Sequence, residues 1–151
     1  MRDAFGGIVN ISMIVVFLVI VSGYLAFNVS YTKAFRVKNK IITTIEQYEG
    51  NCNDTSDCSG IIDKYIQNIG YSPYEYIQVT ATPGCTRIHE PSKNGYYIER
   101  CPANGVEDNQ KVYYKVITFI DINIPIVNKV MSGMNVFRVS GNSKLITQRV
   151  E

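Results

Sequence analysis

The sequence IVNISMIVVFLVIVSGYLAF occupies residues 8–27 and decides the architecture of the chain. No charged side chain occurs from Ala4 to Thr32. A helix of about 20 residues rises ~30 Å, which is the thickness of the hydrocarbon core of a bilayer. The stretch therefore predicts a transmembrane helix at 8–27, after a short N-terminal segment at 1–7. It also makes the lipid bilayer the first expected partner.

Two other interpretations of this stretch remain open. A helix that is apolar all round is either buried in the core of a protein or spans a membrane, and a run as long as residues 8–27 with no polar face is rarely a core helix. A cleaved signal peptide has a basic leading region and a shorter apolar run. Here Asp3 offsets the charge of Arg2, and the apolar run is long. The sequence favours a retained membrane span over both alternatives.

The span is predicted to continue as an amphipathic helix over 28–50, because apolar residues recur every three or four positions. The apolar stripe consists of Ala34, Val37, Ile41, Ile45 and Tyr48, widened by Phe35 and Ile42. The opposite face carries Lys33, Arg36, Lys40, Thr43 and Gln47. Lys38 lies near the apolar side, where it can snorkel or meet a partner carboxylate. Gly50 is a suitable cap for the helix C-terminus.

The remaining residues, 51–151, predict an α+β domain. A short helix capped by Ser59 would place four apolar residues on one face and end at Gly70; they are Ile62, Tyr65, Ile66 and Ile69. Strands are predicted at 74–82, 95–101 and 111–124, followed by a short helix after Pro125. In the last segment, Gly141-Asn142 forms either a hairpin turn or a bulge in one strand.

The expected fold class is therefore α+β. A single N-terminal transmembrane helix extends into an amphipathic helix, which packs on a small antiparallel sheet stapled by disulfides. Four cysteines occur, and an even count beside a membrane span indicates two disulfides in an oxidising space. Three pairings are possible, and we expect Cys52–Cys58 and Cys85–Cys101. A zinc site is the alternative, but neither cysteine spacing is that of a zinc knuckle.

The orientation of the span rests on two conflicting signals. The bases that follow it are Lys33, Arg36, Lys38 and Lys40, whereas only Arg2 precedes it. The positive-inside rule would put the C-terminal side in the cytoplasm, but the cysteines put it outside. Because the bases continue a helix and do not form a short loop, we follow the cysteines. The prediction is a single-pass protein of the cell membrane, with a cytoplasmic N-terminus and an extracytoplasmic domain. The bases then face a neighbouring chain or anionic lipid headgroups.

Several function classes find no support in the sequence. No catalytic or phosphate-binding motif occurs, and His89 is expected in a solvated loop, so neither an enzyme nor a cofactor is predicted. The net charge of +2 gives no global field that would attract nucleic acid. Asp54 and Asp57 provide too few ligands for a calcium site. The sequons at Asn28 and Asn53 matter only in a glycosylating cell.

An uncharged N-terminal span that continues into an amphipathic helix, followed by a small sheet domain, resembles the pilin architecture. More closely, the chain resembles the TadE-like pseudopilins of tight-adherence (Tad) pilus systems. The N-terminal helix of those proteins begins near an arginine and a glycine, as Arg2 and Gly6-Gly7 do here. Residues 117–150 are similar to the closing part of that family, with a strand, a proline, a short helix and a last strand.

The resemblance implies a membrane-anchored structural subunit that contributes to a surface pilus or a secretion-type filament. Its partners would be other pilin-like or membrane subunits. Small and polar residues of the span would mediate helix–helix contact; the candidates are Asn10, Ser12, Ser22, Gly23 and Ala26. Gly7 is the expected cut point of any processing. Asn10 or Ser12 stands where pilin-like proteins carry a glutamate, so assembly through that glutamate is not expected.

Two other functions remain open. One is a membrane-tethered extracytoplasmic module that binds or senses a ligand without polymerising. The other is a component of a viral or mobile-element envelope. In the pilin-like interpretation, residues 9–26 would carry assembly, and the loops at 51–58 and 85–101 would supply the outward contacts.

Overall fold

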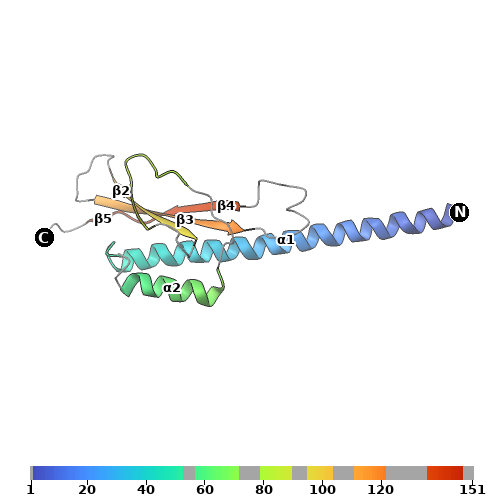
Figure 1. Cartoon of the computed structure of the whole chain (residues 1–151), viewed down its shortest axis with the longest axis horizontal. Coiled ribbons are helices and arrows are strands. Elements are labelled where there is room, and N and C mark those ends of the chain that lie inside the picture. Colours follow the sequence, from blue (N-terminus) through green and yellow to red (C-terminus); the bar gives the residue numbers. More distant parts are fainter. Residues whose placement is uncertain are drawn as a thin grey trace.

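The computed structural model describes residues 2–52, 57–71, 79–89, 95–103, 111–121 and 136–147. They form two helices and one sheet in the expected α+β order (Figure 1). The helices are α1 (Arg2–Gln47) and α2 (Asp57–Ile69). The strands are β1 (Thr86–His89), β2 (Tyr96–Pro102), β3 (Lys111–Asp121), β4 (Val136–Asn142) and β5 (Ile146–Thr147).

Helix α1 is continuous over 46 residues, as the apolar and amphipathic patterns together predict. Its N-terminal half projects away from the domain, and its C-terminal half lies between the sheet and α2 (Figure 1). The change follows the composition, because only the second half has a polar side to turn toward water. There the apolar stripe is buried, with Ala34, Val37 and Ile41 fully covered.

The end of α1 differs from the prediction at one position. Tyr48, expected as the last residue of the stripe, lies beyond the helix and is exposed, because the chain turns after Gln47. Gly50 has a φ of 82°, a conformation that glycine adopts without steric cost. Its N–H donates to the carbonyl of Ile45 at 2.9 Å, which is the expected capping role.

The sheet is antiparallel, in the order β1-β2-β3-β4, with β5 pairing on β3 beyond β4. Alternate residues of β3 point to opposite faces. Tyr114, Val116 and Ile120 join the core that contains the stripe of α1. The Thr118 hydroxyl donates to the carbonyl of Ala34 at 3.2 Å. Strand β3 thus fixes where α1 crosses the sheet.

Two predictions for the middle of the chain are wrong. Part of the strand expected at 74–82 is described, and these residues, 79–82, form no strand. Strand β1 forms instead over Thr86–His89, where a loop was expected. His89 therefore ends a strand, and its ring stacks on that of Tyr96 with 4.4 Å between centroids. This strand forms by pairing with the next strand, β2, and its own short sequence gives no strand pattern.

Helix α2 begins at Asp57 and not after Ser59, because a carboxylate in the first turn suits the positive end of the helix. Its predicted apolar face is present, with Ile62 and Ile66 buried. Gly70 follows the helix with a φ of 64°. The predicted helix after Pro125 and the end of the strand predicted at 111–124 lie outside the described residues.

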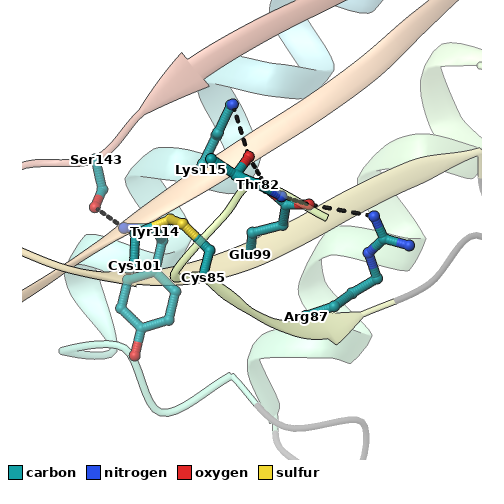
Figure 2. The surroundings of a disulfide bond; sticks show 8 residues. All are labelled: Thr82, Cys85, Arg87, Glu99, Cys101, Tyr114, Lys115 and Ser143. Carbon is teal, nitrogen blue, oxygen red and sulfur yellow. Dashed lines mark hydrogen bonds and ion pairs between the residues drawn. A yellow bond between two sulfur atoms is a disulfide. The ribbon is translucent and has the colours of Figure 1, made fainter. Parts of the chain in front are cut away.

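The hairpin turn at Gly141-Asn142 is also excluded. Both residues belong to β4, where Gly141 pairs with Val116. Strands β4 and β5 lie one after the other along the same side of β3, so the single interrupted strand is the closer description. Ser143 fills the interruption: its Oγ accepts the N–H of Tyr114 at 2.8 Å (Figure 2), and its own N–H donates to the carbonyl of Tyr114 at 2.8 Å.

Candidate functional site: an exposed apolar helix

The N-terminal half of α1 carries the most extensive exposed apolar surface among the residues that the structure describes. Met13 and Phe17, for example, are 71% and 65% exposed. Monomeric soluble proteins rarely expose a continuous patch of this kind. The helix is long and apolar enough to cross a membrane, and none of its most apolar window is buried. Within this chain, this half of α1 is therefore not a buried core helix.

The five residues predicted for helix contact do not share one face. At about 100° per residue, Ser12, Ser22, Gly23 and Ala26 fall within ~100° of arc, whereas Asn10 lies on the opposite side. Gly23 is half-buried and the other four are exposed. A Cβ added to Gly23 would meet nothing within 4 Å. The spacing alone could have separated Asn10 from the rest. Gly7, the expected cut point, lies exposed within α1.

The face with the small residues continues into the face that the domain covers. Ser12, Gly23, Ala34 and Ile45 follow one another at intervals of eleven residues. Eleven residues make close to three helical turns, so these positions lie nearly in line. Ala34 and Ile45 are fully buried in the core. The same side of α1 is thus covered in one half and uncovered in the other.

An aromatic row lies along α1 just after the apolar stretch. The rings of Phe27, Tyr31 and Phe35 stack in sequence, with 6.2 Å between neighbouring centroids. Phe137 of β4 meets Phe27 edge-on at 6.4 Å. The side chain of Lys38 is largely buried, and its Nζ lies 4.3 Å from the centroid of Phe35. Lys38 therefore snorkels along the row, and among the described residues no carboxylate pairs with it.

A polar cluster lies on the other face of the sheet, beside the second disulfide (Figure 2). The carboxylate of Glu99 is fully buried and accepts hydrogen bonds from the Thr82 hydroxyl at 2.6 Å and the Arg87 guanidinium at 3.2 Å. The Thr82 hydroxyl accepts a bond from Lys115 at 3.0 Å. The cluster joins residues 79–82 to strands β1, β2 and β3. The only sequence signal for it was the pair of charged residues, Glu99 and Arg100, in a largely apolar strand.

The environment of Glu99 keeps its carboxylate ionised. Burial alone would raise the pKa of Glu99, but the hydrogen bonds from Thr82 and Arg87 and the charge of Arg87 outweigh it and lower the pKa. A carboxylate satisfied in this way is poorly placed to accept a proton from a substrate. Its evident effect is to hold residues 79–82 against the sheet.

The cysteines form the disulfides Cys52–Cys58 and Cys85–Cys101. The first joins the segment after α1 to the first turn of α2. The second joins the residue before β1 to β2, with 4.3 Å between the Cα atoms. Both lie in the domain, away from the exposed half of α1 (Figure 1).

Comparison with protein-family models, curated proteins and solved structures gives no match to this chain. The resemblance to TadE-like pseudopilins therefore stays a prediction from the sequence.

Proposed function

We propose that this chain is a membrane-anchored, pilin-like structural subunit, similar to TadE-like pseudopilins, that contributes to a surface pilus or a secretion-type filament. The observation that carries the proposal is α1, whose first half is exposed and apolar while its second half is built into the domain. Such a helix joins a membrane or filament core to a projecting domain without a linker between them.

The small residues of α1 support helix–helix assembly. In a bilayer, helices associate through close packing and hydrogen bonds, since lipid removes the hydrophobic drive between them. Ser12, Gly23 and Ala26 would allow a neighbouring helix to approach the backbone closely. They continue the side of α1 that already packs against protein in the domain. We expect the partner helix, from another copy or a related subunit, to lie along this side.

The disulfides support an extracytoplasmic domain and a cytoplasmic N-terminus. Two disulfides in a small domain are typical of an oxidising compartment. The bases after the span favour the reverse orientation by the positive-inside rule, but they lie on α1 and partly against the domain, so they are not a free loop. We give the cysteines the greater weight.

The proposal is tested by crosslinking through single cysteines introduced into the span of the full chain. Ser12→Cys and Gly23→Cys lie on the proposed contact side, and Ile14→Cys lies about opposite to both. In oxidised membranes we expect covalent dimers from the first two variants and few from Ile14→Cys. The native cysteines do not interfere while they remain in disulfides.

Equal crosslinking at all three positions would indicate random collision, and an absence of dimers would indicate a monomeric anchor. Either result would contradict assembly through this side. The second would favour the tethered binding module instead.

A further inference from the structure

Two bases on α1 follow the apolar stretch, and none of the residues that the structure describes pairs with them. Lys33 and Arg36 are three positions apart, which puts them on the same side of a helix. No acidic residue occurs between Gly7 and Ile45. Among the residues that the structure describes, neither base takes part in an ion pair, whereas Arg87 pairs with Glu99. Their charge is therefore available to an anionic group outside the domain.

Their depth along α1 matches the headgroup layer. If residues 8–27 fill the hydrocarbon core, Lys33 lies ~9 Å beyond it and Arg36 ~14 Å beyond it. The headgroup layer adds roughly 5–8 Å on each side. Side chains on a helix lean toward its N-terminus, so both bases lean back toward the membrane. Long basic side chains can cover the remaining few ångströms.

Lys40 provides a contrast on the same side of the helix. It lies ~20 Å beyond the core, and its ammonium is 5.9 Å from the ring centroid of Tyr65 on α2. Lys33 and Lys40 are both half-buried, whereas Arg36 is exposed. Depth, together with the contact between Lys40 and Tyr65, thus sets Lys33 and Arg36 apart from the next base.

The opposite side of the same segment has the chemistry of a membrane interface. The aromatic row of Phe27, Tyr31 and Phe35 lies roughly across the helix from the two bases. Tyr31 and Phe35 remain 43% and 40% exposed although they stack. Tyrosine side chains such as that of Tyr31 concentrate at the level of lipid headgroups. The basic side and the aromatic side of residues 27–36 are therefore both compatible with the lipid headgroup layer.

We propose that Lys33 and Arg36 bind the phosphate groups of anionic phospholipids at the surface of the membrane in which α1 is anchored. Ammonium and guanidinium groups form charge-assisted hydrogen bonds with phosphate, and guanidinium does so with two donors. The proposal rests on the membrane anchoring in the proposed function and does not depend on filament assembly. Its consequence is an anchor that selects its surrounding lipid.

The test uses the full chain reconstituted in vesicles of phosphatidylcholine with a minor fraction of phosphatidylglycerol. Electron spin resonance of spin-labelled lipids measures the preference of the protein for phosphatidylglycerol over phosphatidylcholine. We expect a clear preference for the anionic lipid, which falls by up to about fivefold for each base removed in Lys33→Gln and Arg36→Gln. The exchange variant Lys33→Arg/Arg36→Lys should keep it. Lys111→Gln/Lys144→Gln removes the same charge from exposed sites in the domain and should also keep it.

Three results would overturn the proposal. The first is no preference for the anionic lipid in protein that resists alkaline extraction, in which case the anchoring stands and only the lipid selectivity fails. The second is a preference abolished by inorganic phosphate at constant ionic strength, which would assign the bases to a free anion. The third is an unchanged preference in Lys33→Gln/Arg36→Gln together with a loss of crosslinked dimers, which would assign them to a protein interface. Protein that alkali extracts would overturn both this proposal and the proposed function.

Discussion

Glu99 and Tyr71 are polar side chains held inside apolar layers by groups from distant segments. The Tyr71 hydroxyl accepts the N–H of Phe119 at 2.8 Å and lies 3.0 Å from the carbonyls of both Gly95 and Phe119. It thus occupies the place where β2 would continue beside β3. Burial raises the pKa of Tyr71 to about 12, although the bond from Phe119 acts in the opposite direction. Each side chain accepts a backbone N–H from a segment distant in sequence: Glu99 that of Thr82, and Tyr71 that of Phe119.

Replacing Glu99 by Gln should destabilise the domain by about 1–3 kcal/mol, because Arg87 and Thr82 lose a charged acceptor. The pKa of Glu99 is lowered on folding, so its stabilisation is present above the pKa of the unfolded carboxyl and is lost as the pH falls through the folded value. Urea unfolding in mild detergent at neutral and acid pH measures both effects. The difference between wild type and variant should shrink on acidification.

Glu49→Gln is the matched control, since that side chain is exposed in the turn after α1. A loss of stability in Glu49→Gln equal to that in Glu99→Gln would show that the buried cluster has no special effect.

Replacing Tyr71 by Phe should also cost about 1–3 kcal/mol, because the N–H of Phe119 is left buried without its acceptor. The pKa of Tyr71 in the folded protein lies above the ordinary tyrosine value of 10.0, so the stabilisation is complete below pH 10 and is lost as the pH rises toward 12. The difference in unfolding free energy between wild type and Tyr71→Phe should therefore narrow over that range. Tyr48→Phe, which alters an exposed ring, should change neither the free energy of unfolding nor its dependence on pH.

At the scale of elements, α1 combines two environments that a single helix rarely meets. Its second half is covered by the sheet on one side and by α2 on another (Figure 1). Gly141 of β4 allows this close approach, since a Cβ there would lie 3.0 Å from the Lys38 side chain and 3.1 Å from that of Ile42. The first half has no such cover, and its stability as a helix depends on lipid or on neighbouring helices.

A charge in the middle of the first half of α1 should therefore weaken insertion of the helix into the membrane and leave the fold of the domain unchanged. Leu18→Lys places a base near the centre of 8–27, where the cost of insertion is about 2.5–3.5 kcal/mol. We expect a larger fraction of the protein to be released by alkaline extraction, with unchanged disulfides. Thr43→Lys, on the exposed side of the second half, is the control and should remain in the membrane fraction. Equal release of both variants would contradict a membrane-spanning role for this stretch.

At the scale of the whole molecule, local patterns predicted α1 and β3, because both are long and have a clear periodicity or composition. They did not predict β1, which has four residues and depends on its pairing with β2. Nor did they predict the Glu99 cluster, whose members come from residues 79–82 and from strands β1, β2 and β3. The choice between a turn and a strand at Gly141 was decided by β3, a partner distant in sequence. The exposed helix was predictable, whereas the partner of its small-residue side was not.

The continuity of α1 has a mechanical consequence. About 20 residues of the helix lie beyond the apolar stretch, which gives a rigid arm of ~30 Å. An average tilt of the anchor, ~20°, would carry the far end of that arm sideways by ~10 Å. No flexible joint within α1 would absorb the movement, because the helix is unbroken from Arg2 to Gln47. Torque or tension on the domain would therefore move the membrane-spanning half of α1 together with its second half, as one rigid body.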